Sequence, residues 1–161
     1  MKTAAILTIS DSAHQGKRDD LSGPAVIAEL KSAGFQIATT AVIPDEQDQI
    51  QAALKAHCHG AQLVVTVGGT GIAARDVTPE ATLAVVDRIV PGIAERMRSL
   101  GALKTPLAAL SRGVCGVRGK ALILNLPGSP KAAVESLQAV IDVLPHALEL
   151  LSGNTKHGEI G

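Results

Sequence analysis

Three glycines within four residues make up the most specialised segment of the sequence. Gly68-Gly69-Thr70-Gly71 directly follows the apolar run from Gln62 to Val67. Because glycine lacks a Cβ, the backbone N–H groups of such a loop can approach a phosphate closely. An ordinary turn from a strand into a loop would also explain the segment, but a turn does not need this many glycines. We therefore expect a ligand-binding loop.

Two known nucleotide-binding patterns compete for this loop. Gly69 to Ala74 fits the dinucleotide pattern G-x-G-x-x-A loosely, which leaves a nicotinamide-dependent oxidoreductase as an alternative function. That pattern must open a helix at once, whereas the best helix start comes later, at Thr78-Pro79-Glu80. A P-loop is excluded, because Ala121 follows Gly119-Lys120 and Val114 occupies the position of the required upstream glycine.

Two aspartates follow strand-like runs and could bind a cation. Asp45 comes just after the run Phe35 to Ile43, and Asp76 follows the glycine loop. If the two strands are neighbours, both carboxylates could bind one hard cation such as Mg²⁺, which usually takes one or two protein carboxylates when a nucleotide carries it. Asp45 could instead cap a helix, and Asp76 could form an ion pair with Arg75. The residues alone leave both alternatives open.

The remaining candidate groups give weaker signals. Ser129-Pro130 could cap the last helix and direct its N-terminal N–H groups at an anion, or it could simply cap the helix. His57 and His59 lie two apart on an expected helix and so share no face, which argues against a metal pair. Cys58 and Cys115 form no CxxC motif, so we expect structural thiols in a reducing compartment, the cytoplasm.

Composition excludes several classes of function. The 161 residues are 46% apolar, which is enough for one domain spanning residues 1–161. Fifteen Lys and Arg balance fifteen Asp and Glu, which argues against a general nucleic-acid binder. Phe35 is the only aromatic residue, so polar loops rather than rings must recognise a ligand. No apolar run approaches the length of a membrane helix, so no membrane interaction is expected.

Apolar runs that alternate with helical periodicity supply the elements that must position these residues. We expect strands over 4–9, 35–43, 62–67 and 121–126. We expect helices from Ser22, as N-cap, to Gly34; from Asp45 to Gly60; from Thr78 to about Ile89; from Pro91 to about Gly101; and from Lys131 to Leu151, kinked at Pro145. The stretch from Thr105 to Lys120 permits no assignment, and residues 153–161 are expected to fray.

This alternation is typical of right-handed βαβ crossovers. It predicts an α/β fold, a three-layer α/β/α sandwich with a mostly parallel sheet. Ligands of such folds bind at the carboxyl ends of the strands. The least core-like residues fall at those ends: Ser10-Asp11, Pro44-Asp45, Gly68 to Asp76, and Pro127 to Pro130.

Six motifs taken in order resemble a known family. They are Thr8-Ile9-Ser10-Asp11, Asp20 to Pro24, Pro44-Asp45-Glu46, Gly68 to Gly71, Arg75 to Ala81, and Leu126 to Lys131. Together they resemble the molybdopterin adenylyltransferases, the MogA and MoaB group, which is similar to the G domain of gephyrin. The resemblance covers residues 3 to about 151, and the order and spacing of six motifs make it specific.

The resemblance implies a reaction and an assembly. The reaction is Mg²⁺-dependent transfer of AMP from ATP to the terminal phosphate of molybdopterin, with release of pyrophosphate. The alternative is a module that binds molybdopterin without turnover. The family precedent implies a homo-oligomer, a trimer or sometimes a hexamer, and the metal-insertion enzyme of the same pathway as a further partner. Leu100, Leu103, Leu107 and Leu110 are candidates for the subunit contact.

The resemblance also transfers roles to individual positions. The two functional aspartates of the family fall on Asp45 and Asp76, as catalytic residues that hold Mg²⁺. Because Phe35 is the only aromatic residue, we also expect donors rather than rings to bind the pterin phosphate, with Arg112 and Arg118 as the nearest candidates. The full set of expected substrate-binding residues is Ser10, Asp11, Gly68, Gly69, Thr70, Gly71, Thr78, Pro79, Glu80, Ser111, Arg112, Gly116, Arg118, Pro127, Gly128, Ser129 and Pro130.

Overall fold

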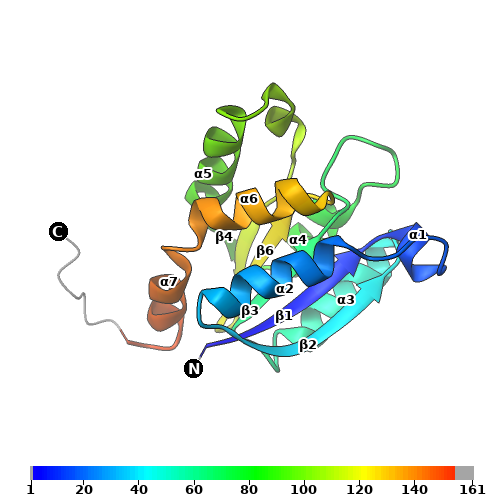
Figure 1. Cartoon of the computed structure of the whole chain (residues 1–161). Coiled ribbons are helices and arrows are strands. Elements are labelled where there is room, and N and C mark those ends of the chain that lie inside the picture. The colour runs from blue at the N-terminus through cyan, green and yellow to red at the C-terminus, as the bar shows by residue number, and fades with distance from the viewer. Residues whose placement is uncertain (1, 155–161) are drawn as a thin grey trace.

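A computed structural model describes residues 2–154 of the chain, and these residues form one six-stranded sheet (Figure 1). The strand order is β2-β1-β3-β6-β5-β4. Four strands run parallel: β1 (Thr3–Ile9), β2 (Gln36–Ile43), β3 (Leu63–Val67) and β6 (Ala121–Leu126). Two short strands, β5 (Cys115–Arg118) and β4 (Arg88–Ile89), extend the β6 edge in antiparallel pairing. The predicted mostly parallel sheet is confirmed.

Helices cover both faces of the sheet and complete the predicted three layers. One face carries α2 (Ser22–Ser32), α5 (Pro91–Ala102), α6 (Pro130–Val140) and α7 (Leu144–Leu151). The other face carries α3 (Gln47–His57) and α4 (Thr78–Val85). Figure 1 shows α2 and α6 across the front of the sheet, with α3 and α4 behind it. All residues of β3 and β6 are buried, as expected for strands covered on both faces.

The buried faces of the helices follow the spacing of their apolar residues. In α6, Ala133, Leu137 and Val140 are fully buried at intervals of four and three residues. In α3, Ile50 and Leu54 are buried one turn apart. The same periodicity that predicted these helices therefore fixes which side of each one packs on the sheet.

The chain reverses direction across the sheet at β1. It passes from β1 to β2 on one side, while β3 pairs with β1 on the other side. In open α/β sheets such a switch point leaves a crevice between the carboxyl ends of the two diverging strands. Gly68, directly after β3, has φ +110°, and a Cβ there would collide with the carbonyl oxygen of Ile9 at the end of β1. Only glycine fits this close approach.

Three expected helix features are wrong. The helix that begins at Thr78 ends at Val85 rather than near Ile89, because Arg88–Ile89 pair with β5 as a strand. The single helix expected from Lys131 to Leu151 is two helices, α6 and α7, and Pro145 stands in the first turn of α7, where its missing N–H leaves no helical bond unmade. The side chain of Ser22 does not cap α2; its hydroxyl donates to the carbonyl oxygen of Gly128 at 2.5 Å.

The stretch from Thr105 to Lys120, which the sequence left unassigned, contains η1 (Pro106–Leu110), a 3₁₀ helix, and β5. A four-residue helix, α1 (Asp11–His14), follows β1. Among residues 2–154, no helix is long and apolar enough to cross a membrane. The fraying expected over residues 153–161 falls mostly on 155–161, which lie outside the described residues.

Candidate active site

Two adjoining pockets open at the carboxyl edge of the sheet. The first has a volume of about 490 Å³ and the second about 410 Å³. Both are lined by Gly69, Asp76, Gly128 and Ser129. These residues belong to the loops that follow β3 and β6, so the shared wall is the edge at which the sequence placed the ligand site.

The first pocket lies between α5, η1 and α6. Its apolar lining includes Ala94, Met97, Leu107 and Leu110. Its polar lining includes Thr70, Ser111, Asn125 and Arg98. The Arg98 guanidinium donates to the carbonyl oxygen of Gly113 at 2.8 Å, so it braces the segment before β5. This pocket can take a ligand with an extended apolar surface.

The second pocket lies between the end of β1, the loop before α2 and the turn after β6. It is lined by Ser10, Asp45, Gly68 and Pro130, together with Arg18, Asp19 and Asp20 of the loop before α2. Asp20 is held in place because it accepts hydrogen bonds from the Thr8 hydroxyl at 2.7 Å and from the Gly23 N–H at 2.9 Å. Arg18, whose role the sequence did not indicate, is a cation in the lining of a pocket that also contains two carboxylates of interest, Asp45 and Asp76.

Asp45 is fixed by a reciprocal interaction with Asp11. The Asp11 N–H donates to Oδ2 of Asp45 at 2.9 Å, and the Asp45 N–H donates to Oδ1 of Asp11 at 3.0 Å. The Ser10 N–H donates to the Ile43 carbonyl at 2.9 Å, which continues the pairing of β1 and β2 up to this point. The ends of the two strands are therefore tied together where Asp45 enters the pocket.

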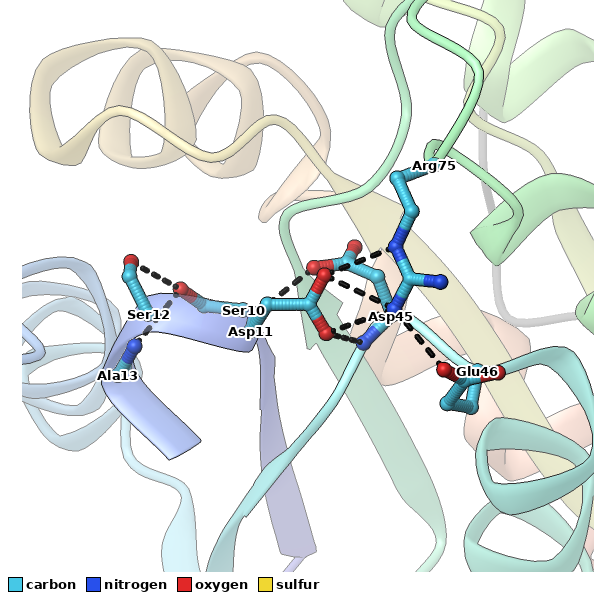
Figure 2. Close-up of polar contacts among 7 residues, drawn as sticks. All are labelled: Ser10, Asp11, Ser12, Ala13, Asp45, Glu46 and Arg75. Atoms are coloured by element: carbon cyan, nitrogen blue, oxygen red, sulfur yellow. Dashed lines mark hydrogen bonds and ion pairs between the residues drawn. The ribbon is translucent and has the colours of Figure 1, made fainter. Parts of the chain in front are cut away.

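Arg75 reaches from its loop across to this pair, as Figure 2 shows. Its Nε donates to Oδ2 of Asp11, and its Nη2 donates to Oδ1 of Asp11 and to Oε1 of Glu46, each at 3.0 Å. The guanidinium holds the pKa of Asp11 below its usual value. The ion pair considered between Arg75 and Asp76 does not form. Arg75 pairs instead with Asp11, which lies 64 positions earlier in the chain, and no local pattern in the sequence could indicate that partner.

Two sequence-based expectations about Asp45 are wrong. Its side chain does not cap a helix, because α3 begins at Gln47 and the Asp45 carboxylate binds the Asp11 N–H instead. The strands before Asp45 and Asp76 are not neighbours, because β1 lies between β2 and β3. The two carboxylates nevertheless line the same pocket, since the Pro44-Asp45 turn passes over the end of β1.

The glycine loop brings these two carboxylates to one place. A Cβ on Gly69 would lie 3.2 Å from Oδ1 of Asp45, and a Cβ on Gly71 would lie 2.8 Å from Oδ2 of Asp76. Gly69 has φ +69°, and a Cβ there would also collide with the Thr78 hydroxyl. That hydroxyl donates to the Gly68 carbonyl at 3.0 Å. The glycines are thus needed for the carboxylates to approach the loop backbone.

The charges of the site fit a bound cation. Burial raises the pKa of Asp45, the hydrogen bond from the Asp11 N–H lowers it, and the nearby negative charges of Asp11 and Asp76 raise it again. No cluster of three or more metal-ligating side chains occurs among residues 2–154, so the protein alone forms no complete metal cage. Two carboxylates at the wall of an open pocket are the donor set that Mg²⁺ uses when nucleotide phosphates and water supply its remaining ligands.

The other predicted site residues fall into three groups. Ser10, Gly68, Thr70, Ser111, Pro127, Gly128, Ser129 and Pro130 line the pockets, and Thr78, Pro79 and Glu80 begin α4 beside the loop. Ser129 caps α6, accepting from the Ala132 N–H at 3.3 Å. Gly116 and Arg118 are not brought to this edge: Gly116 pairs with Ile123 inside the sheet, and Arg118 pairs with Ala121 at the amino end of β6. The Arg118 guanidinium donates to the Val85 carbonyl at 2.7 Å.

Arg112 lies beside the site but lines neither pocket. Its guanidinium binds the Glu80 carboxylate and the carbonyl oxygens of Gly71 and Asp76. The dinucleotide alternative also finds no support in this region, because residues 72–77 form no helix after the glycines. Cys58 and Cys115 are free thiols, as expected.

Comparisons with known proteins agree with this geometry. Residues 5–146 match the family described as "Probable molybdopterin binding domain". The chain is 43% identical to molybdopterin adenylyltransferase from Helicobacter pylori, with 92% of this chain and 87% of that protein covered. It is also 43% identical to molybdopterin adenylyltransferase from Escherichia coli K12, with 92% and 84% covered.

Solved structures extend the comparison to three dimensions. The molybdopterin biosynthesis enzyme MoaB from Thermus thermophilus superposes with a TM-score of 0.89 at 53% identity, covering 95% of this chain and 98% of that one. A MogA structure superposes with a TM-score of 0.87 at 42% identity, covering 93% and 99%. By its sequence match over most of its length and by its fold, the chain belongs to the molybdopterin-binding family that includes the MogA and MoaB proteins.

Proposed function

We propose that this chain is a molybdopterin adenylyltransferase of molybdenum cofactor biosynthesis that depends on Mg²⁺. An oxygen of the terminal phosphate of molybdopterin attacks the α-phosphorus of ATP, the bond between that phosphorus and the bridging oxygen to the β-phosphate breaks, and pyrophosphate leaves. The observation that carries the proposal is the position of Asp76 in the wall shared by two pockets, with Asp45 in the lining of one of them. Two substrates that must react with each other need two adjoining sites with the reacting phosphates at the junction.

The residues of the chain act by positioning and by charge. Asp45 and Asp76 would hold Mg²⁺, which when bound neutralises the negative charge of the ATP phosphates. The glycine loop from Gly68 to Gly71 offers its backbone to phosphate without obstruction by a Cβ. The amino end of α6, capped by Ser129, presents N–H groups and a positive dipole end toward the same junction. Nucleotidyl transfer requires little covalent chemistry from a protein, so this set is sufficient.

The substrates also fit the composition of the pockets. Phe35 is the only Phe, Tyr or Trp of the chain and is buried in the core, and no histidine lines either pocket, so the pocket linings offer the pterin and the adenine no aromatic ring for stacking. Both heterocycles must be held by aliphatic surface and polar groups. The apolar lining of the first pocket, from α5 and η1, provides such a surface.

We further propose that the single domain of residues 1–161 works as a homo-oligomer in the cytoplasm. Leu103 and Leu107 are 82% and 69% exposed, and Leu100 and Leu110 are also exposed. This patch adjoins the first pocket, because Leu107 and Leu110 line it. A closed trimer, or a hexamer built from two trimers, would cover the patch. The adenylylated product would then pass to the enzyme that inserts the metal.

The proposal is tested by incubating the purified protein with ATP, Mg²⁺ and molybdopterin and measuring pyrophosphate. The expected result is one pyrophosphate released per molybdopterin consumed, and none when molybdopterin or Mg²⁺ is left out. Tight binding of molybdopterin without pyrophosphate release would identify the chain as a binding module instead.

A further inference from the structure

We infer that Arg112 is a positioning residue for Asp76. Its guanidinium fixes the loop of residues 71–76 and thereby the place of the Asp76 carboxylate, and it does not bind the substrate phosphate. The inference rests on the proposed function for the role of Asp76. It departs from the phosphate-binding role that the sequence led us to expect for Arg112.

The contacts of Arg112 span the whole loop. Nε donates to the Gly71 carbonyl at 2.7 Å, and Nη2 donates to the Asp76 carbonyl at 2.7 Å. The Arg112 N–H also donates to the Thr70 carbonyl at 2.8 Å. One residue therefore binds the backbone on both sides of the exposed segment that ends in Asp76.

Arg112 is itself anchored to a helix. Nη1 contacts both oxygens of the Glu80 carboxylate, at 2.9 and 2.8 Å, and Glu80 stands in the first turn of α4. The carboxylate raises the pKa of Arg112, so the guanidinium keeps its charge. Through Arg112, the loop of residues 71–76 is therefore tied to α4, a helix that packs on the sheet, and not only to other residues of the loop.

These contacts leave Arg112 poorly placed to bind phosphate. Each of its three guanidinium nitrogens already donates to a protein oxygen. It lines neither pocket, whereas Asp76 lines both. These four hydrogen bonds leave one guanidinium N–H, on Nη2, for any other acceptor, so Arg112 could not bind a phosphate bidentately without breaking a hydrogen bond that shapes the loop.

Asp76 depends on this support. Its side chain makes one protein hydrogen bond, from the Ala73 N–H at 3.0 Å, and that donor belongs to the same loop. Residues 71–77 contain no helix or strand, so side chains hold the loop: Arg112 binds its two ends, and Arg75 pairs with Asp11 and Glu46. When the loop loosens, Asp76 moves with it, and misplacement of a reacting or charge-neutralising group by about 1 Å can cost about 100-fold in rate.

The test compares Arg112→Gln with Arg112→Lys and with Arg96→Gln. Arg96 is a matched control: its Nε donates to the Ala139 carbonyl at 2.7 Å and it pairs with Asp142, but it lines neither pocket. Hydrogen exchange of residues 71–77 reports the loop, Mn²⁺ binding in the presence of a non-hydrolysable ATP analogue reports the metal site, and equilibrium titration reports molybdopterin affinity. Thermal melting shows whether each variant is folded.

We expect Arg112→Gln to speed hydrogen exchange in the loop, to weaken Mn²⁺ binding about 10-fold and to slow adenylyl transfer by about 10- to 100-fold. Molybdopterin affinity should change by less than about twofold, because by this inference Arg112 makes no contact with the substrate phosphate that the substitution could remove. Arg112→Lys should retain little of the function, since an ammonium cannot reach both carbonyls and the carboxylate at once. Arg96→Gln should match the unsubstituted protein in all of these measurements.

A double-mutant cycle with Asp76→Asn adds an independent check. If Arg112 acts through Asp76, the loss from the double variant should be close to the loss from Asp76→Asn alone. Additive losses would overturn the inference, as would a loss of molybdopterin affinity of about 10-fold in Arg112→Gln with unchanged loop exchange.

Should Arg112→Gln fail to fold, Glu80→Gln keeps the arginine but weakens its anchor and should produce the same loop and Mn²⁺ changes. If Asp76→Asn itself turns over normally, the proposed metal role fails, while loop exchange still decides whether Arg112 fixes the loop.

Discussion

Asp11 and Asp45 bind each other's backbone reciprocally, although 34 positions separate them in the chain. Each carboxylate accepts from the N–H of the other residue, at 2.9 and 3.0 Å. The pair joins the carboxyl ends of β1 and β2, and it still leaves Oδ1 of Asp45 close to Gly69 in the second pocket. The reciprocal pair therefore joins the ends of β1 and β2 and also places the Asp45 carboxylate in the second pocket.

Removal of one side chain of this pair should lower the free energy of unfolding. In Asp11→Ala, the Asp45 N–H loses its acceptor and the Arg75 guanidinium keeps only Glu46, and we expect the free energy of unfolding to fall by about 1–2 kcal/mol. Urea denaturation measures it. Asp142→Ala is the control, because Asp142 makes only an exposed ion pair with Arg96 at 3.6 Å and should cost less than about 0.5 kcal/mol. Equal losses in the two variants would show that the reciprocal pair contributes no special stability.

Gly68 should tolerate no side chain. Gly68→Ala places a methyl group against the Ile9 carbonyl at a φ of +110°, so we expect a loss of at least about 2 kcal/mol of unfolding free energy. Gly60→Ala serves as the comparison, because a Cβ at Gly60 meets nothing within 4 Å and its φ is not positive. Thermal melting of both variants checks the prediction. If Gly68→Ala melts at the same temperature as Gly60→Ala, the close contact between β3 and β1 is not rigid.

The buried thiol of Cys115 should make stability depend on high pH. Burial raises the pKa of Cys115 from its ordinary value near 9 to about 12. Because the folded pKa lies above the unfolded one, the contribution is complete below about pH 9 and is lost as pH rises toward 12, by up to about 1.4 kcal/mol per pH unit. Urea denaturation of the unsubstituted protein and of Cys115→Ala at about pH 8 and about pH 10.5 isolates the effect. The difference in unfolding free energy between the two proteins should shrink at the higher pH; a constant difference would contradict a buried neutral thiol.

The leucine patch of α5 and η1 should mediate self-association. Light scattering should give a mass of three or six times 16.4 kDa for the unsubstituted protein at micromolar concentration. Leu103→Glu combined with Leu107→Glu should lower that mass, because two charges would be buried in the contact. Leu83→Glu is the control, since Leu83 is also exposed, at 49%, but lies on α4 on the opposite face of the sheet. A monomeric mass for the unsubstituted protein would refute the proposed assembly.

The sequence predicted the parallel strands because each is a continuous apolar run, and runs of that kind need no knowledge of their neighbours. It also located the ligand edge, since polar and glycine residues follow each of these strands. It could not predict the order of the strands, because periodicity carries no information on pairing. For that reason β1 was not expected between β2 and β3, and the meeting of Asp45 with Asp11 was not expected either.

The partners of the arginines were the least predictable part of the site. The sequence left open an ion pair between Arg75 and its neighbour Asp76, but the long side chain of Arg75 reaches Asp11 and Glu46 instead. Arg112 and Arg118 were both expected at a phosphate. Arg118 lies at the amino end of β6, whereas Arg112 supports the loop of residues 71–76. The sequence did not predict this difference, because the glycine-punctuated stretch from Thr105 to Lys120 gives no sign of β5 or of its antiparallel turn into β6.

The most direct test of the account is single-turnover release of pyrophosphate by Asp76→Asn, with Asp45→Asn beside it. Asparagine keeps the shape of the side chain and removes its charge, so fold and molybdopterin binding should persist. Loss of one strong electrostatic contact in the transition state predicts a rate lower by about 100- to 1000-fold, and a higher Mg²⁺ requirement. A decrease of less than about 10-fold with an unchanged Mg²⁺ requirement would contradict the role of these carboxylates.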